Sequence, residues 1–418
     1  MGAINTGDTA WVLISGALVL FMTPGLAIFY GGMVRVKSTL NMMMMSFAAM
    51  GVTTILWVLY AYSLAFAPDA GHGLIGNLEN VGLNKTITMV MGDPGHQIPA
   101  LSFVMFQLTF AIITVALLSG AIADRAKYSA WLVFVGVWIT VVYAPIAHWT
   151  FARDGWISSH LGALDFAGGT VVEINSGAAA LALALVLGKR EGFRHDPMRP
   201  HNMPLVLLGA GMLWFGWFGF NAGSALGASS LAATAMINTQ IATASAAMSW
   251  LIYERKRQGK ATTLGVASGA IAGAVAITPA CGFVTPLGAL AIGLVGGVIS
   301  AWAVSGKYIF NYDDSLDVVG VHGIGGIVGM VGVGLIATKS VNAMGASGLF
   351  IHGSPSLLWK QLIAVLAAAA YSFIATFIIA KILQKTMGFR VSRNIELEGL
   401  DTNTHAESAY DITAFANR

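Results

Sequence analysis

Charged side chains are scarce in this sequence of 418 residues. Asp, Glu, Lys and Arg make up 10% of it, whereas hydrophobic residues make up 56%. A soluble domain carries roughly 25% charged residues. The hydrophobic residues also recur in runs of about 20, the length that an α-helix needs to cross a bilayer. The shortage of charge therefore excludes an ordinary soluble domain and predicts an integral membrane protein.

Cysteine and the common catalytic motifs are also rare or missing. The chain has one cysteine, Cys281, so no intrachain disulfide can form. It contains neither a phosphate-binding P-loop nor an HExxH motif, and no Cys/His group has the spacing of a zinc site. Lys and Arg occur in short clusters between apolar runs, which is a membrane pattern rather than a nucleic-acid one. We therefore expect no enzymatic activity, no cofactor, no bound metal and no nucleic-acid partner.

Eleven apolar runs predict an all-α membrane protein with eleven transmembrane helices. The predicted spans are 9–31, 40–66, 99–122, 128–147, 168–188, 204–222, 230–252, 262–281, 285–305, 318–338 and 357–384. With the N-terminus outside, nearly all Lys and Arg residues fall in the cytoplasm, as the positive-inside rule requires. The exceptions are Lys85, Arg153, Lys339 and Lys360. We expect a membrane domain over residues 1–387 and a polar, cytoplasmic tail over 388–418.

Two similar stretches predict internal symmetry. LDFAGGTVVEINSG (164–177) opens the fifth span and LDVVGVHGIGG (316–326) opens the tenth. Each has Leu-Asp before an apolar stretch that holds one ionisable residue. The fifth span starts outside and the tenth inside, so we expect two inverted five-helix halves followed by a C-terminal helix. Transporters built this way place their site where the halves meet.

The ionisable residues inside these two spans are Glu173 and His322. A carboxylate at membrane depth costs roughly 2.5–3.5 kcal/mol on insertion scales, so it needs a partner or a polar cavity. One interpretation makes each residue a structural hydrogen-bonding group, and the other makes them a shared site. If both spans began at the membrane faces, the two side chains would lie roughly 15 Å apart at 1.5 Å per residue. Direct contact therefore requires that at least one helix begins in a recess.

Residues near the predicted helix starts are open to two interpretations each. Asp165 and Asp317 have the positions of helix N-caps or loop anchors, roles that need no ligand. Trp149, Phe151 and Trp156 lie in a predicted outer loop, where an aromatic belt is common. Such rings also bind small cations through cation–π contacts.

Several long stretches resemble the ammonium transporter family, which includes Amt, Mep and Rh proteins. They are FMTPGLAIFYGGMVR (21–35), GALDFAGGTVVEIN (162–175), WFGFNAGSA (217–225), ITPACGFV (277–284), DDSLDVVGVHGIGGIVG (313–329) and EGLDTNTHAESAY (398–410). The resemblance covers nearly the whole chain. It implies a homotrimer in the inner (cytoplasmic) membrane, surrounded by lipid, with one hydrophobic ammonium pore in each subunit.

The same resemblance assigns roles to individual residues. A gate of two stacked rings falls on Phe110 and Phe220, and a serine that recruits ammonium falls on Ser224. A structural or electrostatic aspartate near this recruitment site falls on Asp165, and the second pore histidine falls on His322. The resemblance of the tail to that of the family implies that the tail regulates transport and that a PII-type signal protein docks on the cytoplasmic face. Its acidic and polar residues suit packing on basic loops such as ERKRQGK (254–260).

Two positions depart from the family pattern. Glu173 stands where most bacterial members have the first pore histidine, as it does in some fungal members. The recruiting tryptophan falls on Phe151 in an ungapped alignment, and Trp149 is two residues away. The sequence therefore leaves open which ring binds the cation, and whether NH4+ or NH3 plus H+ crosses.

Three functions fit these features. The first is transport of ammonium, with net movement of charge, down its electrochemical gradient. The second is an ammonium sensor that signals through its tail, although the tail adds no enzymatic domain. The third is a channel for a neutral gas, as suggested for Rh relatives. We expect the first of these.

Overall fold

The computed structural model describes residues 4–410, and the described chain is almost entirely helical. Within that part, the strands are β1 (Val90–Met91) and β2 (Ile98–Pro99), which pair in the loop before α4. Nine helical segments of the described chain are long and apolar enough to cross a membrane. They are Thr6–Met33 (α1), Val36–Phe66 (η1, α2, η2 and α3), Ala100–Ile122 (α4 and η4), Tyr128–Leu161 (α5, η5, α6 and η6), Gly169–Leu187 (η7 and α7), Met203–Gly223 (α8), Pro286–Ile309 (α11 and α12), Val319–Ile336 (η8 and α13) and Ser356–Thr386 (α15).

The other two predicted spans are also helical, but one helix is less apolar than these nine and the other is shorter. The span at 230–252 lies in α9 (Ser230–Gln258), a helix of 29 residues interrupted by Ser, Thr, Asn and Gln. The span at 262–281 ends early, because α10 (Thr263–Ile277) has 15 residues and gives way to turns at Pro279. The all-helical membrane fold is thus confirmed, whereas the count of eleven crossings remains a prediction.

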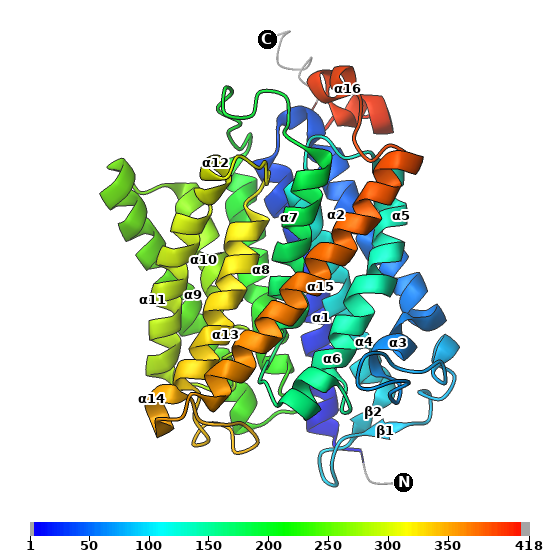
Figure 1. Ribbon diagram of the computed structural model, residues 1–418, viewed down its shortest axis with the longest axis vertical. Helices are drawn as coiled ribbons and strands as arrows, with labels where there is room; N and C mark the ends of the chain where they lie inside the picture. The colour runs from blue at the N-terminus through cyan, green and yellow to red at the C-terminus, as the bar shows by residue number, and fades with distance from the viewer. Residues whose placement is uncertain (1–3, 411–418) are drawn as a thin grey trace.

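The long helices stand side by side and form one upright bundle (Figure 1). In this view α1 begins at the lower end, and the short helix α16 (Arg393–Glu398) lies at the upper end, which we call the tail side. The helix α7 (Asn175–Leu187) runs toward the tail side, whereas α13 (Gly325–Ile336) runs away from it. The helix α15 crosses the bundle obliquely and packs on both of them.

Glycines bring these two oppositely directed helices into backbone contact. A Cβ atom on Gly177 would lie 2.2 Å from the Cα of Gly323, and one on Gly326 would lie 2.8 Å from the Cβ of Glu173. In lipid no hydrophobic force presses helix against helix, so small residues are what permit such an approach. The crossing therefore depends on the missing side chains.

The tail packs on loops at its own side of the bundle. The backbone of Val391 donates to the carbonyl of Arg125 at 3.0 Å, and Glu191 donates its N–H to the carboxylate of Glu396 at 2.6 Å. The carboxylate of Asp401 accepts the N–H groups of Leu40 and Asn41 at 3.0 and 2.8 Å, at the start of α2 (Thr39–Leu56).

No hydrogen bond or ion pair joins the described part of the tail to 254–260, so that packing stays a prediction. The acidic groups of the tail accept backbone N–H groups instead, and Glu396 also pairs with Arg390 at 2.7 Å. Glu254 itself accepts the N–H and hydroxyl of Thr262, both at 3.0 Å. Residues 411–418 of the predicted tail lie outside the described part.

We expect Gly177→Ala to lower the stability of the folded protein. The new methyl group has no space against the backbone of Gly323, and overpacking of this kind costs about 1–3 kcal/mol. Thermal unfolding in detergent measures the effect. Gly51→Ala is the matched control, because a Cβ on Gly51 meets nothing within 4 Å. Equal melting temperatures for the two variants would contradict the prediction.

Candidate functional site

The two ionisable residues predicted inside spans are in direct contact. The Nδ1 atom of His322 lies 2.7 Å from Oε2 of Glu173, and the two residues are 4% and 0% exposed. Glu173 comes from η7 (Gly169–Ile174) and His322 from η8 (Val319–Ile324), both π-helical turns. The distance of roughly 15 Å that applies to helices starting at the membrane faces is therefore not observed. A hydrogen bond joins the two side chains at the helix crossing.

A carboxylate holds the start of each of these helices. Asp165 accepts the backbone N–H groups of Gly168, Gly169 and Thr170 at 2.8, 2.6 and 2.7 Å. In the second helix Asp314 accepts the N–H of Val319 at 2.7 Å. Free N–H groups at a helix start need such partners when water is excluded.

These caps correct the internal alignment that the sequence suggested. Asp165 lies eight residues before Glu173 (173 − 165), and Asp314 lies eight before His322 (322 − 314). The capping counterpart of Asp165 is therefore Asp314, and of the two roles open to Asp317 its carboxylate has that of a loop anchor rather than an N-cap. Asp317 pairs with Lys307 at 2.6 Å instead. The repeated Leu-Asp letters misled the alignment because the second helix has its capping carboxylate three residues earlier.

The hydrogen bonds of Asp165 fit a structural role. Its carboxylate makes four hydrogen bonds, and all of them go to residues 168–170, including the Thr170 hydroxyl at 2.5 Å. Both oxygens are thus engaged in holding the turn. A part for this carboxylate in recruiting ammonium stays untested.

Two phenylalanines stack beside the pair. The ring centroids of Phe110, on α4 (Ala100–Leu118), and Phe220, on α8, are 4.2 Å apart with an angle of 33°. Both rings are buried, at 0% and 1% exposure. Phe106 contacts Phe110 with centroids 4.9 Å apart. Sequence reasoning missed Phe106, although it lies one helical turn before Phe110.

Of the two candidate outer aromatics, Phe151 lies at this gate. Its ring centroid is 6.5 Å from that of Phe110, at 87°. The Trp149 ring packs on Tyr371, with centroids 4.8 Å apart, and its Nε1 donates to the carbonyl of Leu74 at 2.8 Å. Ser224 donates its hydroxyl to the carbonyl of Phe220 at 2.8 Å, which fixes it directly at the gate.

Two small cavities flank His322. The first is lined by Met22, Leu26, Phe29, Ile113, Leu117, Val172, Glu173, Leu213, Trp217, Phe220, Ile271 and His322. The second is lined by Phe29, Tyr30, Met33, Ser268, Ile271, Leu316, Val321 and His322. In each cavity the centre of a water-sized molecule can move within a volume of about 10 Å³. A cavity of this size holds roughly one such molecule.

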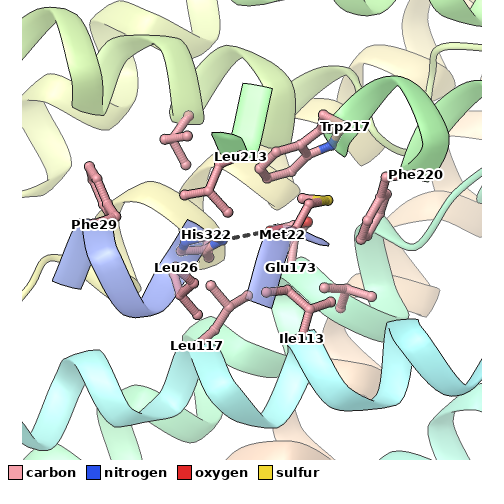
Figure 2. Close-up of a pocket in the computed structure, with 12 residues that line it drawn as sticks. Met22, Leu26, Phe29, Ile113, Leu117, Glu173, Leu213, Trp217, Phe220 and His322 are labelled. Carbon is pink, nitrogen blue, oxygen red and sulfur yellow. Dashed lines mark hydrogen bonds and ion pairs between the residues drawn. The ribbon is translucent and has the colours of Figure 1, made fainter. Parts of the chain in front are cut away.

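The cavities and the gate lie in series. Figure 2 shows Trp217 and Phe220 on one side of the Glu173–His322 pair and Phe29 on the other. The walls are apolar apart from a few groups, and Trp217 turns its N–H away to Thr278 at 2.9 Å. Trp217 and Phe29 were not predicted as lining residues, because apolar residues in apolar helices carry no signal of which side they face.

A network of buried charges lies on the tail side of the pair. Arg190 contacts Asp313 at 2.9 Å and Asp124 at 3.3 Å. Burial by itself would raise the pKa of Asp313, but the hydrogen bonds from Arg190 and the charges of Arg125 and Arg190 lower it to about 2. Asp313 therefore stays ionised at neutral pH, and the loop that leads to Asp314 is anchored.

A buried acid–histidine pair beside two small, mostly apolar cavities, inside a helical membrane bundle, is typical of a membrane transport protein. A model of the Ammonium Transporter Family matches residues 10–410. The chain belongs to this family, as its sequence motifs predicted. The family and its relatives are transporters rather than enzymes, so the prediction of a non-enzyme is confirmed.

Relatives match over nearly their whole length. The ammonium transporter of Mycobacterium tuberculosis is 53% identical over 438 residues, with 99% of this chain and 92% of the relative covered. The Bacillus subtilis ammonium transporter is 49% identical, with 97% and 99% covered.

Solved structures agree with this relationship. Saccharomyces cerevisiae Mep2 matches with a TM-score of 0.86 and 34% identity, over 94% of this chain and 88% of that one. A chain described as a sensor Amt protein matches with a TM-score of 0.87 and 28% identity, over 96% and 98%.

We expect Phe220→Glu to abolish flux. The substitution puts a charged side chain against Phe110 in a passage that excludes water, where an unpaired charge is costly. Uptake of labelled methylammonium by whole cells measures the effect, with the amount of folded protein in the membrane as the control. Undiminished uptake by a well-folded variant would remove Phe220 from the passage.

Proposed function

We propose that this protein transports ammonium across the cytoplasmic membrane, through the passage between the phenylalanine gate and the second cavity. The observation that carries the proposal is the buried Glu173–His322 contact between two cavities of molecular size. The names of the relatives support ammonium as the substrate. The decisive experiment is the ammonium-evoked current of the purified protein in liposomes on a solid-supported membrane.

The proposed topology has eleven crossings, with the N-terminus outside and the tail in the cytoplasm. The opposite directions of α7 and α13 support two inverted halves, as do their matching carboxylate caps. The helices α9 and α10 supply the two crossings that composition alone does not identify. The tail side is then the cytoplasmic side, where the Lys and Arg clusters of the sequence lie.

The chemistry of ammonium suits the pair. Ammonium in water is mostly a cation, and a bare cation in an apolar passage is prohibitively costly. Either the cation gives up its proton to the pair, or the carboxylate compensates its charge. Oε1 of Glu173 is buried without a hydrogen-bond partner among the described residues, and an ammonium ion offers the N–H donors that it lacks. Phe151 is the ring that receives the cation at the gate, with Ser224 beside it.

The protein forms a homotrimer with one pore in each subunit. An exposed face of α9 supports this assembly. Gln240 lies on that face and accepts a hydrogen bond from Trp214 at 3.1 Å, at a depth where lipid would be a poor neighbour for an amide. In the trimer a second copy covers this face.

The tail regulates transport, and a PII-type signal protein docks beside it on the cytoplasmic face. The contacts of Asp401 with α2 and of Glu396 with the end of α7 support the first point. A second candidate function, ammonium sensing, is favoured by the likeness to the sensor Amt protein. Growth rescue of a cell that lacks its own ammonium uptake separates the two, because a sensor does not restore growth.

We expect Glu173→Gln to reduce the ammonium-evoked current strongly, because it keeps the size of the side chain but removes the charge. Glu173→His restores the usual family pair and should keep transport with a shifted pH dependence or ion selectivity. His322→Ala should be the most damaging, because it also leaves Glu173 buried without its partner. Currents from pH 5 to 8, the interval in which histidine titrates, measure these effects.

The control is the quantity of folded protein reconstituted in each case. If Glu173→Gln and His322→Ala both transport like the parent, the pair is structural and the proposed mechanism is wrong.

We expect deletion of the residues after Gly388 to lower or uncouple transport without abolishing the trimer. Asp401→Ala should reproduce part of the loss, because it leaves the N–H groups of Leu40 and Asn41 without their acceptor. Glu407→Ala is the control, since Glu407 is an exposed acid of the same tail. Assembly is followed by gel filtration and activity by current. Full activity of the truncated protein would contradict the prediction.

A further inference from the structure

The loop before His322 contains a buried carboxylate that the passage itself does not use. Asp314 is 1% exposed, and its Oδ2 atom accepts the N–H of Val319 at 2.7 Å. Its Oδ1 atom is buried and has no hydrogen-bond partner among the described residues. Asp165 has a hydroxyl partner at the matching place, Thr170, whereas Val319 has none to offer. Asp314 is therefore held in place by the one backbone group that opens the helix of His322.

The charged and titratable neighbours of Asp314 come from several elements. Lys307, at the end of α11 and α12, donates to the Asp314 carbonyl at 3.2 Å and pairs with Asp317 at 2.6 Å. Burial and the charge of Asp317 raise the pKa of Asp314 to about 6, against the charge of Lys307. The remaining groups are Asp313 in its own loop, bound to Arg190, and the phenols of Tyr312 and Tyr30. Above pH 6 the carboxylate is ionised.

The helix of His322 has little freedom except at this start. Gly320 lies against the backbone of Val304, where a Cβ would be 2.9 Å from its nitrogen. Gly323 lies against Gly177 on the other side. The N–H of Val321 is held by the carbonyl of Asp317 at 2.9 Å. Since these contacts are fixed, the hydrogen bond from Val319 to Asp314 determines the conformation of the first helical turn. That conformation in turn determines the direction of the His322 imidazole.

We propose that Asp314 is a positioning residue for His322, as Asp165 is for Glu173: its ionised carboxylate holds the π-helical turn that aims the imidazole at Glu173. This rests on the proposed function only insofar as the His322–Glu173 contact serves transport. The carboxylate also lies at a helix N-terminus, where a negative charge is favourable. The carboxylate binds the N–H of Val319, three residues before His322 in the same helical turn.

The negative charge of Asp314 leads to a prediction that would not follow if Asp314 were only a structural cap. Removing the buried charge changes the electrostatic field at the acid–histidine pair, so the pH at which the pair titrates should move in the variants that lack this charge. Glu173 from η7 and Tyr30 from α1 also face His322, but they are the same in every variant of Asp314.

Two substitutions separate the hydrogen bond from the charge. Asp314→Asn keeps an oxygen for the N–H of Val319 and removes the charge, whereas Asp314→Ala removes both. Asp317→Asn is the control, because it removes a carboxylate from the same loop but no cap. Each protein is reconstituted in liposomes, and ammonium-evoked current is measured per folded trimer. Solid-state NMR of ¹⁵N-labelled histidine rings, assigned with His322→Asn, gives the protonation midpoint.

We expect Asp314→Ala to lose at least tenfold in current, Asp314→Asn to stay within about threefold of the parent, and Asp317→Asn to keep its rate. The protonation midpoint measured on the His322 ring should differ from that of the parent in both variants of Asp314. The proposal is overturned if Asp314→Asn is as slow as Asp314→Ala, or if the midpoint does not move. Should Asp314→Ala not fold, the midpoint in Asp314→Asn decides. A parent protein without current refutes the proposed function, while the NMR measurement still tests Asp314.

Discussion

The contact between Glu173 and His322 is the constraint on which the rest of the structure depends. A carboxylate at membrane depth costs roughly 2.5–3.5 kcal/mol on insertion scales, so its helix must bring it to a partner. The partner lies 2.7 Å away on a helix that runs in the opposite direction. The two helices also come into backbone contact there, which the missing side chains of Gly177 and Gly323 permit. Much of the abundant glycine of the chain is explained by crossings of this kind.

A central meeting point also forces both helices to begin inside the protein. Their first N–H groups then lie away from water, where each unsatisfied group is costly. Asp165 and Asp314 satisfy them from within the chain. The residue after each aspartate donates to a carbonyl of the other half, Phe166 to Pro279 at 3.1 Å and Ser315 to Ala121 at 3.3 Å. An aspartate caps both helix starts because both have backbone N–H groups that would otherwise be unsatisfied.

The sequence predicted the parts of this arrangement that follow from hydrophobicity and from buried charge. Apolar runs located the long helices, including α9, although α9 also carries Ser, Thr, Asn and Gln residues. Some of these polar side chains point into the protein, as Asn238 does toward the carbonyl of Cys281. Glu173 and His322 were found because ionisable residues are rare in apolar runs. The cap by Asp314, the position of Phe151 and the contacts of the tail were not predictable. Each depends on which of several nearby residues faces a given backbone group or ring, and tertiary packing rather than local sequence makes that choice.

The glutamate at position 173 changes what the pair can do for a cation. A pair of histidines has a net charge of zero or more, because a neutral imidazole can only gain a proton and become positive. An acid and a histidine together have a net charge of minus one, zero or plus one, and their titrations are coupled so that the proton belongs to the pair. In the least protonated state the pair has a net negative charge, which under the proposed function would compensate the charge of a cation in the cavity. The imidazole then has to stay within hydrogen-bond distance of the carboxylate in every state, since separation would leave a buried, unpaired charge. The need for fixed geometry at the crossing therefore follows from the acid itself, and it is met by glycines on one side of His322 and by a capped helix start on the other.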